Sequence, residues 1–145
     1  MLTGDARYAD VLERELYNGA LTGVSLSGNS YTYVNPLAAD NGNSRWSWNG
    51  CPCCPPMFLK LMSAMPGYIY AQDDTGIYVN LFVGSQASIQ LPHQKVVLKQ
   101  TTDYPWHGDV KINVDPARSG NLGIIYNVTQ AYGFLSGFCS ASIVV

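Results

Sequence analysis

The residues Cys51-Pro52-Cys53-Cys54-Pro55-Pro56 form the stretch that decides the fold of this chain. Proline is favoured in the first turn of a helix, because its missing N–H would have no partner there. Apolar residues then recur at helical spacing, namely Met57, Phe58, Leu61, Met62 and Met65. The sequence therefore predicts a helix that starts near Pro55 and ends before Pro66-Gly67.

This helix start places Cys53 and Cys54 at the N-terminal end of the predicted helix. The helix dipole and the unpaired backbone N–H groups favour anions there, and therefore the thiolate form of a cysteine. The alternative is that the cysteines are small buried hydrophobic residues. A disulfide between such close neighbours would strain the backbone, because disulfides prefer Cα separations of about 4.4–6.8 Å. The cluster favours a metal site or a nucleophile.

The residues before the cluster predict one helix and one short hairpin. Asp5 is a good N-cap, and an apolar stripe follows it over residues 6–18, ending at Gly19; its members are Tyr8, Val11, Leu12 and Leu16. The glutamates Glu13 and Glu15 are expected on the solvated face. Alternation over residues 20–37 predicts the hairpin. The polar loop 38–50 carries Trp46 and Trp48, which could stack on a sugar but are expected to pack on the core.

The character of the chain changes at Pro66-Gly67, which is the predicted domain boundary. Short alternating stretches separated by turn residues predict an antiparallel sandwich. These stretches are 67–71, 77–83, 88–91, 96–101 and 110–114. His93 and His107 fall in its loops and are expected to be exposed. The tail from Ser119 to Val145 contains no charged residue and lacks clean alternation.

Composition excludes several classes of function. The chain has 145 residues, 47% hydrophobic and 12% charged, with a net charge of −2. This charge gives no electrostatic reason to expect nucleic acid or an anionic membrane as a partner. No run of apolar residues is long enough to span a bilayer, and the N-terminus shows no signal peptide. Four irregularly spaced cysteines indicate a reducing compartment, so we expect the cytoplasm, with the periplasm as an alternative for the full-length protein.

The residue patterns do not supply a complete active site. The carboxylates lie in caps, turns or on the first helix, so none is predicted to be a buried catalytic acid. No phosphate-binding loop or Ser-His-Asp arrangement is recognisable. A structural zinc needs four ligands and a catalytic zinc usually three, and the short run from Cys51 to Cys54 cannot easily supply them all.

Four motifs together resemble glycoside hydrolase family 127, whose type activity is β-L-arabinofuranosidase. They are Leu2-Thr-Gly-Asp-Ala-Arg-Tyr-Ala-Asp-Val-Leu-Glu-Arg-Glu-Leu-Tyr-Asn-Gly, Tyr33-Val-Asn-Pro-Leu, Cys53-Cys54-Pro-Pro and Met65-Pro-Gly-Tyr-Ile-Tyr. The resemblance implies an α+β fragment of a bacterial enzyme. Residues 1–66 would be the last helices of an (α/α)6 catalytic barrel. Residues 67–145 would be an incomplete antiparallel β-sandwich domain, with an atypical tail from about residue 119.

The resemblance also implies a site. Cys53 would be the nucleophile of a retaining glycosidase that releases non-reducing-end β-L-arabinofuranose or a related sugar. Cys53 and Cys54 would bind zinc together with a Glu and a Cys upstream of this chain, where the acid/base glutamate is also expected. A zinc-bound thiolate stays ionised at neutral pH. Tyr33 would face the substrate. The isolated chain is expected to be inactive, because these other groups lie outside it.

Two other functions remain open. The chain could be a non-catalytic zinc- or carbohydrate-binding module, with Trp46, Trp48 or Trp106 as a stacking surface. It could also be a thiol-redox protein, because Cys51 and Cys54 have C-x-x-C spacing, although they do not fall inside a βαβ pattern.

Overall fold

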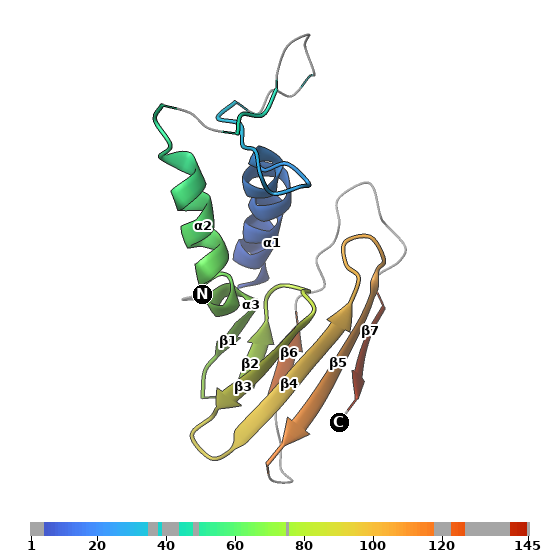
Figure 1. Ribbon diagram of the computed structural model, residues 1–145. Helices are drawn as coiled ribbons and strands as arrows, with labels where there is room; N and C mark the ends of the chain where they lie inside the picture. Colours follow the sequence, from blue (N-terminus) through green and yellow to red (C-terminus); the bar gives the residue numbers. More distant parts are fainter. Residues whose placement is uncertain are drawn as a thin grey trace. The chain divides into compact units, whose positions relative to one another are not determined.

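The computed structural model describes residues 5–34, 38, 44–47, 50–74, 76–117, 123–126 and 140–144 (Figure 1). The described residues divide into two compact units, one within Arg7–Met65 and the other from Pro66 onward together with Asp5 and Ala6. The first unit holds the two longer helices and the second holds all the strands. The predicted α+β class is therefore confirmed.

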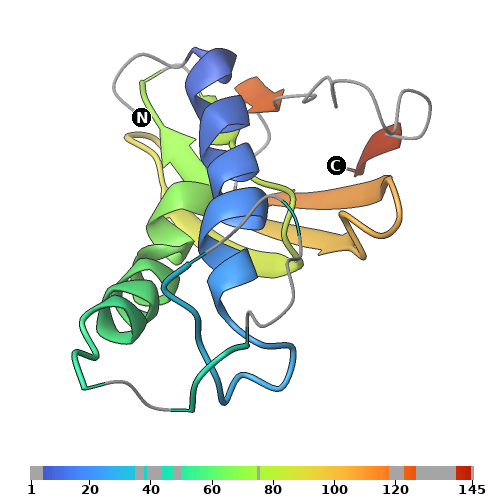
Figure 2. The ribbon, with the colours of Figure 1, turned by 90° about the horizontal axis from the view of Figure 1, so that it is seen from above.

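The first helix, α1 (Ala6–Glu15), continues through a π-helical turn, η1 (Leu16–Ala20), into the 3-10 turn η2 (Leu21–Gly23) (Figure 2). The N–H of Leu21 donates to the carbonyl of Leu16, the wide spacing of a π turn. The helix predicted over residues 6–18 is confirmed. It does not stop at Gly19, because the widened turn carries the chain on to Ala20.

The face of α1 that is buried differs from the predicted one. Glu13 is only 7% exposed and is buried together with Ala9 and Leu16, whereas Tyr8 and Val11 are 59% and 50% exposed. The prediction that Glu13 faces solvent is wrong. Which face of a helix is covered depends on its neighbours in space, and the periodicity of α1 alone does not show them.

The segment after η2 forms bridges rather than full strands. Val24 pairs with Tyr31, and Tyr31 pairs with Trp46, both antiparallel. Gly28 has a φ of +72°, which allows the tight turn between the first two partners. The hairpin predicted over residues 20–37 is thus reduced to single bridges, and residues 35–37 lie outside the described residues.

The second long helix, α2 (Cys54–Ala64), begins and ends where the prolines predict. None of its residues is buried, and Met57 and Leu59 are 60% and 63% exposed. A short helix, α3 (Pro66–Ile69), follows in place of the predicted start of a strand, because Pro66 again opens a helical turn. Among the described residues, the helices are too short or too polar to span a lipid bilayer.

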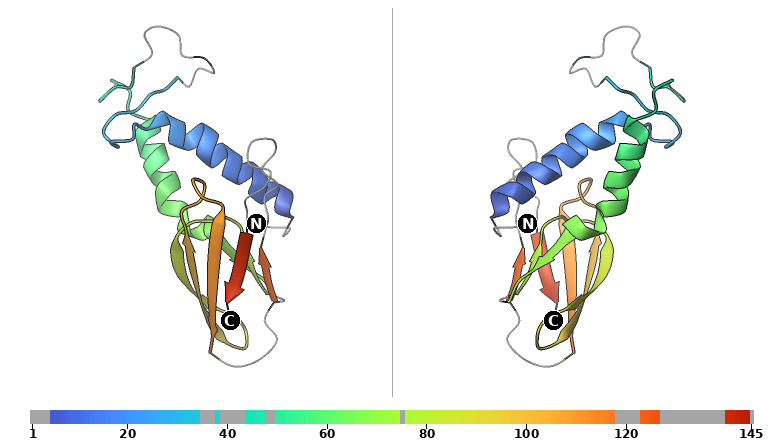
Figure 3. Two further views of the ribbon diagram at one scale, coloured as in Figure 1. Left: turned by 90° about the vertical axis from the view of Figure 1, so that its right-hand side faces the viewer. Right: turned by 90° about the vertical axis from the view of Figure 1, so that its left-hand side faces the viewer.

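The second unit contains two sheets (Figure 3). The three-stranded sheet has the order β1-β2-β6, with β1 (Tyr70–Gln72), β2 (Gly76–Val79) and β6 (Gly123–Tyr126). The four-stranded sheet has the order β3-β4-β5-β7, with β3 (Ser85–Gln90), β4 (Lys95–Thr102), β5 (Asp109–Pro116) and β7 (Ser140–Val144).

The strand pairing is mostly antiparallel, as predicted. The pairs β1–β2, β3–β4 and β4–β5 are antiparallel. The strands β6 and β7 join in parallel, with Ile77 opposite Ile124 and Ile112 opposite Ile143. Both parallel strands come from the uncharged tail, whose sequence lacks the alternation that would have revealed them.

One hydrophobic cluster takes residues from both sheets. Alternate residues of β4 and β5 point into it, and so do two residues of β2; these are Val96, Leu98, Val110, Ile112, Val114, Ile77 and Val79. Phe82 and Leu91 complete the buried set. Gln100 on β4 is also buried, at 3% exposed, and its Nε2 donates to the Leu81 carbonyl and to the Tyr70 hydroxyl.

Candidate active site

Three cysteines lie at the start of α2. Cys53 is the N-cap residue, Cys54 is the first helical residue, and proline occupies the first turn. The N–H of Cys53 donates to the Cys51 carbonyl at 3.0 Å, which closes a tight turn. The Cys53 sulfur lies 3.9 Å from the Cys51 sulfur and 3.7 Å from the Cys54 sulfur. The fold therefore brings the Cys53 sulfur between two others.

The three cysteines differ in exposure. Cys51 and Cys53 are exposed, and Cys54 is half-buried. Burial raises the pKa of the Cys54 thiol, and the hydrogen bond to Cys53 and the charges of the other two sulfurs raise it further. This is opposite to the effect expected from the helix N-terminus. Burial disfavours the charged thiolate most, and crowded sulfurs that repel one another when ionised add to this effect.

The Cys53 and Cys54 sulfurs have a spacing that suits one metal ion. Two thiolates at about 2.3 Å from a tetrahedral zinc lie about 3.8 Å apart. The separation of 3.7 Å between these two sulfurs is close to that distance. Within the described ranges, no group of three or more His, Cys, Asp or Glu side chains could hold a metal ion. These two sulfurs could supply two of the four ligands of a zinc site.

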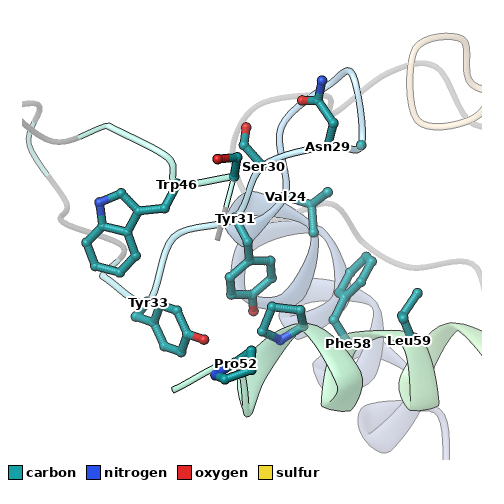
Figure 4. Close-up of a pocket in the computed structure, with 12 residues that line it drawn as sticks. Val24, Asn29, Ser30, Tyr31, Tyr33, Trp46, Pro52, Phe58 and Leu59 are labelled. Atoms are coloured by element: carbon teal, nitrogen blue, oxygen red, sulfur yellow. The ribbon is translucent and has the colours of Figure 1, made fainter. Parts of the chain in front are cut away.

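An aromatic cluster adjoins the cysteine turn. The Tyr33 hydroxyl donates to the Cys51 carbonyl at 2.6 Å. The Tyr33 ring is tilted by 32° against Trp46 at a centroid distance of 5.5 Å, and it meets the edge of Tyr31 at 5.8 Å. Tyr31 in turn contacts Phe58 of α2 at 6.3 Å. Figure 4 shows these rings together beside the start of the helix.

A cavity of about 260 Å³ opens between this aromatic cluster and α2 (Figure 4). Its walls combine aromatic and proline rings with small polar side chains. The lining residues are Val24, Gly28, Asn29, Ser30, Tyr31, Tyr33, Trp46, Ser47, Pro52, Pro55, Phe58 and Leu59. Pro52 and Pro55 flank Cys53 and Cys54 in the chain, so the turn that carries the sulfurs borders the cavity. Apolar rings with a few polar groups are typical of small-molecule sites.

The tryptophans and histidines considered in the sequence lie in both units. Trp46 is 42% exposed and lines the cavity instead of packing in a core, so that expectation is wrong. Trp48 lies outside the described residues. Trp106, 85% exposed, lies with the exposed His107 in the loop between β4 and β5, and His93 is exposed as predicted.

Sequence reasoning did not single out Tyr31 and Phe58 as site residues. The bridge to Trp46 brings Tyr31 to the cavity, and the first turns of α2 bring Phe58 against the Tyr31 ring. Burial and the charge of Cys54 raise the pKa of Tyr31. Burial and the charges of all three cysteines raise the pKa of Tyr33, with Cys53 as the strongest of the three, and a hydrogen bond with the Cys54 backbone offsets part of this rise. Both hydroxyls therefore lie within the electrostatic reach of the sulfurs.

Two sequence families match the chain in succession. The family described as β-L-arabinofuranosidase, GH127 catalytic domain, matches residues 1–67, and the GH127 middle domain matches residues 76–127. A non-reducing end β-L-arabinofuranosidase of Bifidobacterium longum subsp. longum is 35% identical over 83% of this chain. The chain spans 20% of the length of that relative.

Solved structures agree with this match. A GH127 β-L-arabinofuranosidase from Geobacillus stearothermophilus T6 superposes with a TM-score of 0.78 at 36% identity, covering 85% of this chain and 21% of that one. A second GH127 β-arabinofuranosidase superposes with a TM-score of 0.73 at 45% identity, covering 78% of this chain and 18% of its own. Together with the two family matches, these similarities show that the chain belongs to glycoside hydrolase family 127.

Proposed function

We propose that this chain is part of a retaining glycoside hydrolase that releases non-reducing-end β-L-arabinofuranose or a related sugar, with Cys53 as the nucleophile. The observation that carries the proposal is the exposed Cys53 sulfur, paired with Cys54 at 3.7 Å on a turn that borders an aromatic cavity. The activity named for the relatives supports the choice of sugar.

The proposed reaction is a double displacement at the anomeric carbon of the sugar. The Cys53 sulfur attacks the anomeric carbon and forms a C–S bond, while the bond from that carbon to the leaving oxygen breaks. A general acid outside this chain gives the leaving oxygen its proton. Water then displaces the sulfur with a second inversion, so the product keeps its configuration. Tyr33 and Trp46 offer ring faces to the sugar, and Ser30 and Asn29 offer hydrogen bonds.

Cys53 and Cys54 would hold zinc in this proposal, with further ligands outside the chain. A bound zinc keeps thiolates ionised at neutral pH. A cation would oppose the burial and the neighbouring sulfurs that raise the pKa of Cys54. The short separation of the two sulfurs supports a shared ion.

The division into domains belongs to the same proposal. Residues 1–66 would complete an (α/α)6 catalytic barrel, and residues 67–145 would form the β-sandwich of a middle domain. The exposed apolar residues of α2 support the assignment of residues 1–66 to a barrel. A helix inside a barrel packs on neighbouring helices along its length, and such neighbours would cover these residues. The cluster shared by the two sheets supports the second.

The test uses the full-length protein that contains this chain and a chromogenic aryl β-L-arabinofuranoside. Cys53→Ala is expected to lower kcat at least about 1,000-fold, since a lost nucleophile removes the covalent route. Cys51→Ala is the matched control, with a change below about tenfold. Product stereochemistry by NMR should show retention. An inverted product, or full activity in Cys53→Ala, would contradict the proposal.

The 145-residue chain alone is expected to show little or no turnover, because the acid/base group and two zinc ligands would be missing. Strong turnover by the purified chain, abolished by Cys53→Ala, would contradict the placement of those groups outside it. The measurement is release of the same chromogenic sugar, with zinc added in excess.

A second candidate function is a carbohydrate-binding module, and Trp106 is the observation that favours it. Its side chain is 85% exposed on a loop held by hydrogen bonds from the N–H groups of Trp106 and His107 to the Asp103 carbonyl. An exposed indole on an ordered loop can stack on a sugar ring. Calorimetry with arabino-oligosaccharides decides: binding that survives loss of both Cys53 and Cys54, but not Trp106→Ala, supports the module.

A further inference from the structure

The Cys51 carbonyl accepts two hydrogen bonds that together fix the cysteine turn. One comes from the N–H of Cys53 at 3.0 Å and closes the turn locally. The other comes from the hydroxyl of Tyr33, 18 residues earlier in the chain, at 2.6 Å. The second bond is short, and it ties the turn to a separate part of the unit.

Tyr33 is itself held on two sides. Its ring contacts Trp46 at 5.5 Å and Tyr31 at 5.8 Å. Those two residues are joined by a reciprocal pair of backbone hydrogen bonds, each of 2.8 Å. The hydroxyl therefore reaches the Cys51 carbonyl from a braced aromatic ring rather than from a freely rotating side chain. A braced donor loses little conformational entropy when it forms its hydrogen bond.

We propose that Tyr33 is a positioning residue, which holds the Cys51–Cys53 turn through the Cys51 carbonyl and thereby fixes the Cys53 sulfur. This inference deepens the proposed function, since it concerns the residue proposed as the nucleophile. It concerns the hydroxyl of Tyr33 and not the ring face proposed to meet the sugar, because the hydroxyl donates its proton to the Cys51 carbonyl. The hydroxyl oxygen also interacts with the Cys54 backbone, which ties Tyr33 to the first residue of α2 as well.

The test measures the reactivity of each thiol in the metal-free 145-residue chain. Iodoacetamide labelling is followed by tandem mass spectrometry, which resolves the rates at Cys51, Cys53 and Cys54. In Tyr33→Phe we expect the ratio of the Cys53 rate to the Cys54 rate to change about threefold to tenfold, the effect of one lost hydrogen bond of ordinary net strength. The melting temperature should stay within a few degrees of the parent.

Tyr31→Phe is the matched control, because it removes a hydroxyl from the same cluster but leaves the bond from Tyr33 to Cys51 in place. Its labelling ratio should equal that of the parent chain. An unchanged ratio in Tyr33→Phe, the same change in Tyr31→Phe, or an equal acceleration at all three cysteines would overturn the proposal. The last result would indicate loosening of the whole unit.

A second measurement needs no variant. In the parent chain, the hydroxyl proton of Tyr33 should exchange with solvent at least about tenfold more slowly than that of the exposed Tyr8, as seen by NMR of ¹³C-labelled tyrosine. Equal exchange rates would overturn the proposal. Neither measurement depends on glycosidase activity, so its failure is distinct from failure of the proposed function.

In the full-length protein the two roles of Tyr33 separate kinetically. Positioning predicts that Tyr33→Phe lowers kcat about threefold to tenfold and leaves KM unchanged, because the nucleophile is misplaced after binding. A rise in KM at constant kcat would show substrate binding and overturn the positioning role.

Discussion

At the scale of single residues, Cys54 shows a thiol whose pKa is raised although it lies at the N-terminus of a helix. It opens α2, where the dipole favours an anion, yet burial and two adjacent sulfurs raise the pKa of its thiol. In the metal-free chain this thiol should therefore stay protonated at pH values where an ordinary cysteine has ionised. A folded-state pKa above the unfolded value means that the folded chain holds the proton more tightly.

The raised pKa of Cys54 determines how the stability of the folded chain depends on pH. Stability contributed by the Cys54 thiol is fully present below its usual pKa of 9.0 and is lost as the pH rises above that value. The rate of iodoacetamide labelling at Cys54, measured from pH 6 to 11, should show a midpoint above the one measured for the same chain unfolded in urea. A midpoint equal to or below that of the unfolded chain would contradict the expectation.

Gly23 is predicted to be intolerant of a side chain. It is buried in η2, and a Cβ there would lie 2.9 Å from the Tyr31 ring. Gly23→Ala should lower the free energy of unfolding by about 1–3 kcal/mol, because the ring must move. Gly19→Ala is the control, since nothing lies within 4 Å of its Cβ. Urea unfolding should show no loss for Gly19→Ala, and equal effects of both would contradict the argument.

Part of the site could be predicted from its residues. The prolines mark the start of α2, and three cysteines within four residues are enough by themselves to indicate thiol chemistry. The cavity could not be predicted, because its walls depend on the bridge between Tyr31 and Trp46. Nor could the bond from Tyr33 to Cys51, which joins residues that lie on different segments. Contacts of this kind carry no periodic signal.

At the scale of secondary-structure elements, the parallel pair β2–β6 depends on Gly76. A Cβ at Gly76 would collide with the backbone carbonyl of Gly123, its partner in the register. Gly76→Ala should cost about 3 kcal/mol, since backbone atoms cannot move aside as a side chain can. Gly84→Ala is the control, because its Cβ would meet only an ordinary contact at 3.7 Å. A loss within about 0.5 kcal/mol for Gly76→Ala would contradict this reasoning.

A polar link between β1, β3 and β4 should contribute to the stability of the second unit. The Tyr70 hydroxyl is within 2.9 Å of the Ser85 hydroxyl and accepts from Gln100 Nε2 at 3.0 Å. Tyr70→Phe should lower the free energy of unfolding by about 1–2 kcal/mol, because buried partners lose a hydrogen bond. Tyr68→Phe, at an exposed position, should change it by less than about 0.5 kcal/mol. Thermal or urea unfolding of both variants makes the comparison.

The elements themselves were predicted best where periodicity was strong. The two long helices and the strands β3, β4 and β5 lie within a few residues of their predicted positions. The start of β1 was misplaced, because Pro66 opens a helical turn that delays the strand to Tyr70. The buried face of α1 was also misjudged, since Glu13 is covered and Tyr8 is not. The first error lies in local helix-start chemistry at Pro66, and the second arises because tertiary context decides which face of α1 is covered.

At the scale of the whole molecule, the exposed apolar residues of α2 should cause the chain to self-associate. Met57 and Leu59 are 60% and 63% exposed on a helix without a buried residue. Exposed apolar surface of this kind promotes association. The chain should therefore self-associate with rising concentration, and the double substitution Met57→Gln with Leu59→Gln should weaken association several-fold in sedimentation velocity runs. Ser63→Gln on the same helix is the control, and an equal effect there would count against the explanation.

The parallel edge strands also govern how the second unit assembles. The hairpins β3–β4 and β4–β5 join neighbours in sequence, whereas β6 and β7 reach partners far earlier in the chain. Closing long loops is entropically costly, so the local meander should form the folding nucleus and the parallel strands should dock last. Until they do, the free sides of β2 and β5 are open to strands of other molecules. Nascent chains released before β6 and β7 emerge would thus be the species most prone to misassembly.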